Sequence, residues 1–301
     1  MTSVIGSVEQ TSVASRPAAA DLRRPRGQLI RRHPRLVIGG GLVVLLLFVA
    51  IFAPLLTHYD PIVGDIENSL DPPSAAHWLG TDDQGRDVMA RVLYGARVSL
   101  SVAAISVTIG VVVGVTMGLA AGYAGGTTDL LLMRVIDALL AFPGLLLAIS
   151  ITAALGAQLQ NAMIAIGVVA IPVYARLTRA QILALKEREF VTAARAIGVA
   201  PIFIALRHLL PNMANALIVQ ATLTTAFAIL QEAVLSFLGL GAQPPTPSWG
   251  QDINYNQRYI TNLVWWGTVG PGLAIFIAVF AFNFLGDALR DWLDPQFRRR
   301  G

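Results

Sequence analysis

Long apolar runs dominate the sequence, and they limit the chain to folds that lie in a lipid bilayer. Of the 301 residues, 55% are hydrophobic and only 13% are charged. A helix needs about 20 apolar residues to cross a bilayer, and it satisfies its backbone polar groups within itself, as the bilayer requires. The sequence therefore predicts an all-α integral membrane protein with six transmembrane helices, over Leu36–Leu56, Val98–Gly122, Leu130–Leu155, Ala162–Leu177, Leu209–Gln231 and Leu263–Gly286.

The division between the third and fourth helices rests on a short polar segment. No charged residue occurs from Ala138 to Ala175, and this run is too long for one helix. Its polar middle, Gly156–Asn161, is predicted to be the turn. Pro143 and Pro172 fall inside the two helices, and each is expected to kink its helix because proline cannot complete the backbone hydrogen bonding.

The distribution of basic residues predicts the orientation of the helices. With the N-terminus inside, 18 of the 22 Lys and Arg residues fall in cytoplasmic segments and four in external ones. This bias is typical of membrane proteins, so both termini are predicted to be cytoplasmic. It also explains the net charge of +4 without a nucleic-acid partner. The first external loop, 57–97, is acidic, with seven Asp and Glu residues against three Arg.

These assignments divide the chain into four parts. Residues 1–35 are a basic cytoplasmic tail that we expect to be disordered, and they are too long and too charged to begin a cleaved signal peptide. Residues 36–96 hold the first transmembrane helix and the acidic external loop. Residues 97–287 form a five-helix core with a cytoplasmic loop at 178–212, and residues 288–301 form a cytoplasmic tail.

Glycine recurs at every fourth position of the second predicted helix, at Gly110, Gly114, Gly118 and Gly122. A ridge without side chains lets another helix approach closely. We expect the ridge either to line a pore or meet another subunit, or to serve helix packing within the chain.

Arg134 and Asp137 are the charged residues of the third predicted helix. At this spacing they can pair on one helix face. An ionisable group inside a span suggests a function, but these two lie near the predicted cytoplasmic end. That position favours a paired anchor at the membrane surface.

Residues that bind metals or nucleotides are sparse. The chain has no cysteine, and its histidines (His33, His58, His77 and His208) are predicted to lie on both sides of the membrane. Lys186, the only lysine, is not part of a glycine-rich phosphate loop. We therefore expect no catalytic, metal-binding or cofactor-binding residue in this chain. If transport is driven by ATP, another polypeptide binds the ATP and its Mg²⁺.

The cytoplasmic segment Phe190–Asn212 carries a distinctive pattern. It is basic, and it places the small residues Ala193, Ala194 and Gly198 on a short helical stretch before Pro201. Small side chains let a helix sit deep in a groove, and glycine or proline lets the chain turn away afterwards. A loop that only joined two helices would not need this pattern.

Four stretches together resemble one family. Phe190–Asn212 resembles the EAA loop of ABC-importer permeases. Leu79–Leu100, Ser236–Gly250 and Leu285–Pro295 are similar to segments of the C-type permeases of dipeptide and oligopeptide ABC transporters. The stretches occur in the order and on the membrane sides expected of that family, and the resemblance extends from about residue 30 to residue 297.

The resemblance implies a type I importer fold in the bacterial cytoplasmic (inner) membrane. It also implies a complex with a second, homologous permease subunit, two cytoplasmic ATPase subunits that bind ATP and Mg²⁺, and an external substrate-binding protein. The loop would then form a coupling helix that docks on an ATPase through Thr192, Ala193, Ala194, Arg195, Ile197, Gly198, Val199, Ala200 and Pro201. The family often has Glu where this chain has Thr192, so the contact made by that Glu is expected either to be absent or to be supplied by a neighbour such as Glu187 or Glu189.

The sequence thus predicts a permease subunit for di- or oligopeptides that forms half of a translocation pathway. Similar proteins carry glutathione, nickel chelates or opines. An ion-coupled secondary transporter is an alternative of another class, but it usually has polar or charged groups at mid-membrane, where this sequence is apolar or has glycine. A membrane scaffold without transport activity would not need the patterned loop. Because uniform tight binding does not speed turnover, we expect substrate choice to lie mostly with the binding protein.

The binding protein is expected to dock on the acidic external loop and on the proline-rich loop Gln243–Trp249. Proline restricts the backbone, and the second loop is expected to present Trp249 at the membrane interface.

Overall fold

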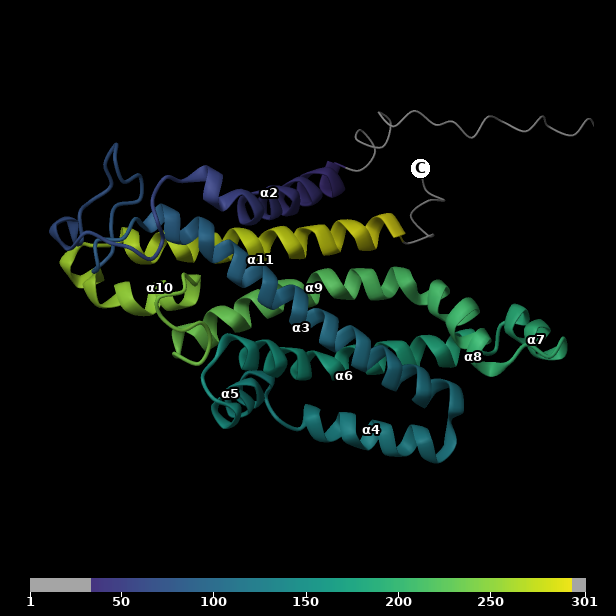
Figure 1. The fold of residues 1–301 in the computed structure, drawn as a ribbon. Coiled ribbons are helices and arrows are strands. Elements are labelled where there is room, and N and C mark those ends of the chain that lie inside the picture. Colours follow the sequence, from purple (N-terminus) through teal and green to yellow (C-terminus); the bar gives the residue numbers. More distant parts are fainter. Residues whose placement is uncertain (1–33, 294–301) are drawn as a thin grey trace, which may run out of the picture.

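The structure, a computed structural model, describes residues 34–293 as an elongated bundle of helices (Figure 1). The predicted cytoplasmic tails lie mostly outside these residues. Of the two tails, only 34–35 and 288–293 are described, and they belong to the first and last helices of the bundle.

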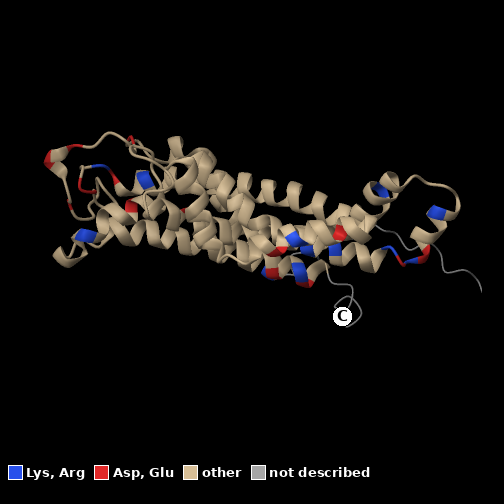
Figure 2. Ribbon diagram, turned by 90° about the horizontal axis from the view of Figure 1, so that it is seen from below, with Lys and Arg blue, Asp and Glu red and all other residues tan. Residues whose placement is uncertain are grey.

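Within the described residues, five helices are long and apolar enough to cross a membrane, or six spans exist if one bent pair of helices counts as a span. Charged residues gather at one end of the bundle and over the opposite half of its length, and a stretch between these two groups is poor in charge (Figure 2). The long helices are α2 (Pro34–Leu56), α3 (Val88–Ala124), α6 (Leu159–Leu185), α9 (Leu210–Phe237) and α11 (Trp266–Leu293).

The bent pair corresponds to the third predicted helix, and the prediction of one helix over Leu130–Leu155 is wrong. The segment forms α4 (Gly126–Leu140) and α5 (Gly144–Leu155), which meet at 90°. Pro143 lies in the break, directly before α5. Proline disfavours a helical conformation in the residue before it, so the expected kink becomes a complete interruption. Pro172, in contrast, lies inside α6, which is assigned as one helix from Leu159 to Leu185.

The second predicted helix begins ten residues earlier than the sequence indicated. The Asp87 side chain accepts a 2.6 Å hydrogen bond from the Ala90 backbone N–H and caps α3 at its N-terminus. A carboxylate at this position satisfies an amide that has no partner within the helix. The predicted start directly follows Arg97, but α3 includes both Arg91 and Arg97.

Short elements form the two ends of the bundle (Figure 1). One end, called here the α7 end, holds α7 (Glu189–Ala196), α8 (Pro201–Phe203) and a π-helical turn, η2 (Ile204–Leu209). The opposite α10 end holds η1 (Ile66–Asn68), α10 (Trp249–Asn256) and η3 (Gln257–Asn262).

The glycine ridge of α3 lies against α6. A Cβ on Gly114 would lie 2.6 Å from the Ile171 carbonyl oxygen, and a Cβ on Gly118 would lie 2.5 Å from that of Ala175. Only glycine permits such close approach of two backbones. Of the two roles considered for the ridge, the structure supports packing within the chain.

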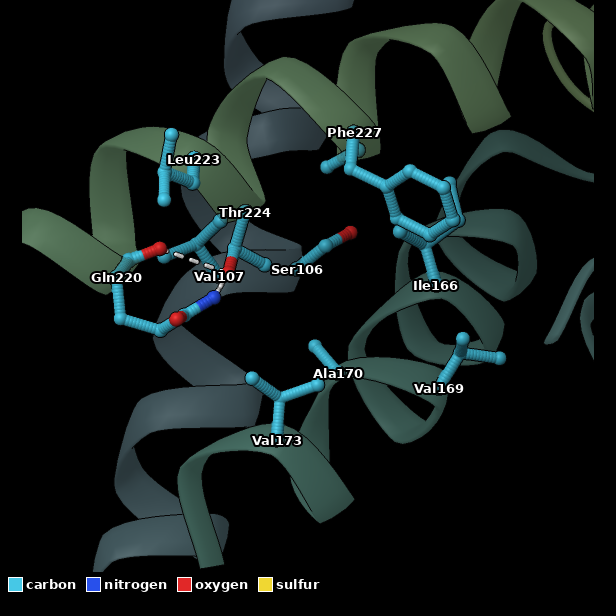
Figure 3. Close-up of a pocket in the computed structure, with 11 residues that line it drawn as sticks. Ser106, Val107, Ile166, Val169, Ala170, Val173, Gln220, Leu223, Thr224 and Phe227 are labelled. Atoms are coloured by element: carbon cyan, nitrogen blue, oxygen red, sulfur yellow. Dashed lines mark hydrogen bonds between the residues drawn. The ribbon is translucent and has the colours of Figure 1, made fainter. Parts of the chain in front are cut away.

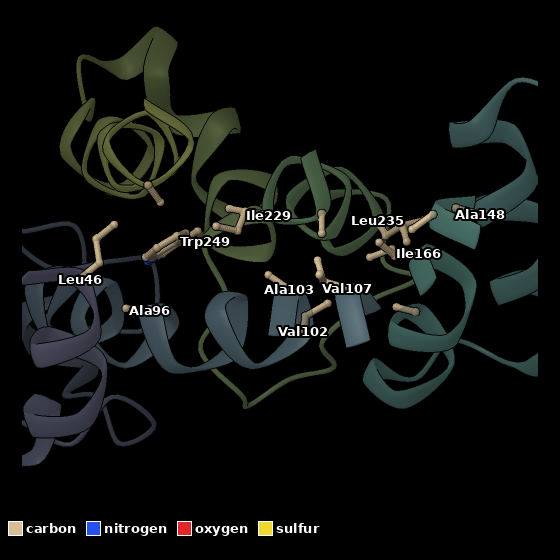
Figure 4. Packing of buried hydrophobic residues seen from close by; sticks show 14 of the residues in the cluster. Leu46, Ala96, Val102, Ala103, Val107, Ala148, Ile166, Ile229, Leu235 and Trp249 are labelled. Atoms are coloured by element: carbon tan, nitrogen blue, oxygen red, sulfur yellow. The ribbon is translucent and has the colours of Figure 1, made fainter. Parts of the chain in front are cut away.

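The main apolar core runs between α2, α3, α6, α9 and α11 and continues to α10 (Figure 4). It includes Val102 and Val107 of α3, Ile229 of α9 and the indole of Trp249. This core packs α3, α6 and α9 against one another.

Candidate functional site: a coupling segment, a mid-bundle pocket and a buried polar layer

A small apolar core attaches α7 to the ends of three long helices. Val191 and Ala194 are buried on one face of α7. The Arg195 guanidinium also lies 5.9 Å from the centre of the Tyr123 ring in α3, within range of a cation–π interaction. A displacement of α7 would therefore be transmitted to the bundle. The buried members of this core are Ile182, Val191, Ala194, Ile204, Leu209 and Met213.

The chain leaves α7 through a glycine turn. Gly198 has a φ of +78°, and the Val199 N–H donates a 3.1 Å hydrogen bond to the Ala194 carbonyl. This is the bond of a Schellman motif, in which glycine is favoured because a Cβ is strained at positive φ. Pro201 then begins α8.

On both sides of this turn the segment exposes large apolar side chains. Ile197 is 80% exposed, Ile202 60% and Phe203 61%. We call these three residues the α7 tip. Large apolar groups that are exposed in this way can mark a contact with another protein or with a membrane.

The residues predicted to dock on an ATPase differ in their exposure to solvent. Ala194 faces the inside of its own chain and is only 6% exposed. Its small size therefore serves the packing of α7, and the interpretation that it enters a groove on another subunit is wrong. Val199 is half-buried, and the remaining members are exposed, namely Thr192, Ala193, Arg195, Ile197, Gly198, Ala200 and Pro201.

At the α10 end, the proline-rich loop differs from the prediction. Trp249 is 1% exposed, and its indole N–H donates a 2.8 Å hydrogen bond to the Val92 carbonyl. Ser248 is fully buried as well. The expectation that the loop presents Trp249 at the membrane interface is wrong, because the indole fills the space beside Gly95, where a Cβ would lie 2.7 Å from the ring. Gln243–Pro245 remain exposed.

A buried carboxylate lies next to this loop. Glu232, in α9, is fully buried and accepts hydrogen bonds from three serine hydroxyls. Ser99 of α3 donates at 2.7 Å, Ser236 of α9 at 2.8 Å and Ser248 at 3.0 Å. A buried charge is costly unless hydrogen bonds compensate for its hydration, and here they join two helices and the loop.

Arg91 connects α3 to α10 and to the loop after α2. Its Nε donates a 2.8 Å hydrogen bond to Asp252 Oδ1, and its Nη1 donates to the Pro61 carbonyl at 2.8 Å. The Asp82 carboxylate forms an ion pair with the neighbouring Arg86, at 2.7 Å.

The pKa of Asp83 is raised, first by burial and then by the negative charge of Asp82. The Arg258 guanidinium, 3.7 Å from the Asp83 carboxylate, opposes this shift.

Two ion pairs connect α4 to α6. Asp129 binds Arg179 through both of its carboxylate oxygens, at 2.5 and 2.6 Å. Asp137 pairs with Arg176 at 2.7 Å. The predicted pair of Asp137 with Arg134 is therefore wrong, because α6 brings a different arginine to this carboxylate.

A pocket opens at mid-height of the bundle, between α3, α6 and α9 (Figure 3). It encloses about 590 Å³ of empty space, including the part that is open to its surroundings. No charged residue lines it. Its polar members are Ser106, Gln220 and Thr224, and its apolar members are Val107, Ile166, Val169, Ala170, Val173, Leu223, Phe227 and Ala228.

Comparisons with known proteins identify the family to which this chain belongs. Residues 110–299 match the family described as "binding-protein-dependent transport system inner membrane component", and residues 28–73 match the N-terminal transmembrane domain of oligopeptide transport permease C. The chain belongs to this permease family. It is thus a permease subunit of an ABC importer, a multi-pass protein of the bacterial inner membrane that works with ATPase and substrate-binding components.

Similar proteins include two groups of permeases. The dipeptide transport system permease protein DppC of Alkalihalophilus pseudofirmus is 45% identical over 89% of this chain and 88% of that protein. The glutathione transport system permease protein GsiD of Shigella flexneri is 46% identical over the same shares. A solved structure of the MetNI methionine ABC transporter matches 68% of this permease and 98% of its own chain, with a TM-score of 0.55 and 24% identity. This likeness shows the type I importer fold.

Sequence reasoning missed most of the pocket in this permease. It also missed most of the buried polar groups around Glu232 and Arg91. Gln220, Thr224 and Gln231 recur on one face of α9, and this polar periodicity in an apolar helix was the available signal. Glu232 ends the uncharged run of the sequence, and the prediction therefore placed it outside the helix that contains it. Among residues 34–293, no three His, Asp or Glu side chains are arranged to hold a metal ion.

Proposed function

We propose that this permease forms one half of the translocation pathway of an importer for di- or oligopeptides. It pairs with a second, homologous permease, and α7 docks on one of two ATPase subunits. The pathway is closed and opened by changes in the ATPase pair, which bias the two states of the permeases.

The observation that carries the proposal is the construction of the α7 end. Ile197, Ile202 and Phe203 are exposed there, while Val191 and Ala194 fasten the same segment to α3, α6 and α9. A segment built in this way can receive a force from another subunit and pass it to the helices that surround the pocket. The α7 end is accordingly assigned to the cytoplasm, in agreement with the excess of basic residues on that side of the predicted topology.

The substrate class rests on the relatives. The printed names of the similar permeases refer to dipeptide and to glutathione transport. Glutathione is itself a small peptide, so both names agree with a pathway for short peptides. We place the choice between such substrates mainly on the external binding protein, because the pocket offers no charged group to select among them.

Uptake by the reconstituted transporter tests the proposal. The permease, its partner permease, the ATPases and the binding protein are placed in proteoliposomes, and accumulation of radiolabelled dialanine and of labelled glutathione is measured with ATP. Uptake of at least one of them is expected, and it should be lost when the phosphate-loop lysine of the ATPases is replaced. Absence of ATP-dependent uptake of both, from a complex that hydrolyses ATP, would contradict the peptide assignment.

A further inference from the structure

We propose that the pocket between α3, α6 and α9 is a contact site for the transported peptide, at which uncharged side chains of α9 hydrogen-bond to the backbone amides of the peptide. This inference rests on the proposed function, and it adds the place and the chemistry of the contact.

A stripe of polar side chains runs along α9. Gln220, Thr224 and Gln231 are spaced by four and seven residues, so they lie on one face of a helix with 3.6 residues per turn. Phe227 and Ala228 lie on the same face and line the pocket. The stripe runs lengthwise along the bundle, past the pocket, in the direction that a transported molecule must follow.

The Gln231 side chain has hydrogen-bonding groups without partners among the described residues. Its side chain is 3% exposed, and neither its Nε2 nor its Oε1 has a partner among the described residues. A buried amide without partners costs free energy, so an amide kept in this state suggests a partner that comes and goes. The group lies beside the pocket, because a Cβ on Gly144 would be 3.8 Å from Gln231 Nε2 and 3.0 Å from Val169, a lining residue.

Gln220 and Thr224, which line the pocket, form hydrogen bonds with each other. Gln220 Nε2 donates a 3.1 Å hydrogen bond to Thr224 Oγ1, which in turn donates to the Gln220 carbonyl at 2.9 Å. No described residue donates to Gln220 Oε1. In Figure 3 this side chain lies in the space between α9 and the side chains of Ala170 and Val173.

The chemistry of these groups matches a peptide backbone. A glutamine side chain offers both a donor and an acceptor, as a peptide unit does. The remaining lining is apolar and uncharged, so it tolerates different peptide side chains and holds none of them tightly. Weak contact suits a pathway, since a site that bound the ground state tightly would slow release. A lipid acyl chain in the pocket would leave the Gln231 amide without partners.

The absence of native cysteine allows a direct test of the environment. Thr224→Cys and Thr225→Cys are a matched pair, because both hydroxyls donate to the carbonyl four residues earlier, but only Thr224 lines the pocket. Each variant is assembled into the full transporter, treated with a charged, membrane-impermeant thiol reagent, and read on the isolated permease chain. Labelling at Thr224→Cys is expected, with severalfold slowing by dialanine and loaded binding protein. Labelling at Thr225→Cys should not respond to dialanine.

If Thr224→Cys reacts with a lipid-soluble maleimide but not with the membrane-impermeant reagent, the proposal is overturned, because the pocket would then face the acyl chains. Equal slowing at both positions would also overturn it, since the effect would then report a general conformational change.

A second experiment measures the contribution of Gln231. Gln231→Met keeps a similar volume and removes both hydrogen-bonding groups. Dialanine uptake per ATP hydrolysed should fall severalfold in proteoliposomes, while the thermal stability of the complex is unchanged or higher because an unpaired buried amide is gone. Thr225→Val is the control and should keep normal uptake.

Normal uptake by Gln231→Met, with the wild-type complex active, would overturn the pocket proposal alone. A wild-type complex that hydrolyses ATP but imports neither dialanine nor glutathione would overturn the proposed function and the pocket together.

Discussion

Ser99 of α3 and Glu232 of α9 are joined by a 2.7 Å hydrogen bond, and both side chains are fully buried. Ser236 and Ser248 donate to the other oxygen of the same carboxylate. Three serine hydroxyls, from α3, α9 and the proline-rich loop, thus donate to one carboxylate. The external part of the bundle, in the predicted topology, is held together at this point.

Replacing the carboxylate should weaken this junction. Glu232→Leu removes the acceptor of three buried hydroxyls and is expected to lower the stability of the permease by about 1–3 kcal/mol, the usual cost of leaving a buried group unpaired. Glu232→Gln keeps one acceptor oxygen and should cost less. Thermal unfolding of the purified transporter measures both variants. Equal stability of Glu232→Leu and the wild type would contradict the structural role of the carboxylate.

The turn after α7 predicts a second pair of variants. A side chain branched at Cβ is strained at the positive φ of Gly198, and residues in the left-handed region cost roughly 1–2 kcal/mol. Gly198→Val should therefore disturb the end of α7 and reduce uptake at normal expression. Gly198→Asn should retain more of the uptake, because asparagine tolerates this backbone conformation. No atom lies within 4 Å of the position of a Cβ on Gly198, so a clash inside the chain does not explain the effect. Similar uptake by the two variants would show that the backbone conformation is not what matters there.

The ion pair between α4 and α6 predicts a charge-reversal result. Asp129→Arg or Arg179→Asp alone should lower stability, and the double variant should recover part of it. Both side chains are partly exposed, so a coupling free energy of about 1 kcal/mol is expected. A double-variant cycle by thermal or denaturant unfolding measures this coupling. Strict additivity of the two single effects would show that the pair does not hold α4 to α6.

The membrane topology gives a fourth prediction. Reporter fusions after Gln10 and after Arg300 should both be active as cytoplasmic reporters, and a fusion after Asp71 should be active as an external one. The basis is the distribution of Lys and Arg over the loops. An external signal at either terminus would reverse the assignment of the α7 end to the cytoplasm.

Much of the fold could be predicted because apolar length and charge are local properties. The runs that became α2, α6, α9 and α11 were recognised, although α6, α9 and α11 extend past their predicted ends into segments that carry charged residues. Arg91 and Glu232 lie inside α3 and α9 because Asp252 and the three serines compensate for their burial. Of these partners, Asp252 and Ser99 are distant in the sequence from the residues they bind. Periodicity cannot show such compensation.

The candidate site was only partly predictable for a related reason. The small residues of α7 were recognised, but Ala194 and Gly198 look alike in sequence, and only the fold distinguishes the one that packs inward from the one that forms the turn. Trp249 follows a proline-rich loop and was expected to be exposed, yet Gly95 leaves a space that its indole fills. The break between α4 and α5 was read as a kink, because a proline pattern does not fix the size of a bend.

Cross-linking from the α7 tip tests the central claim most directly. Ile197→Cys, 80% exposed, is placed in the assembled transporter and joined to nearby lysines with a short thiol-to-amine reagent. Val63→Cys, 71% exposed in the loop after α2, is the matched control. We predict that Ile197→Cys captures an ATPase subunit and that Val63→Cys does not. Capture of the ATPase by Val63→Cys, or its absence at Ile197→Cys in a transporter that imports peptide, would contradict coupling through α7.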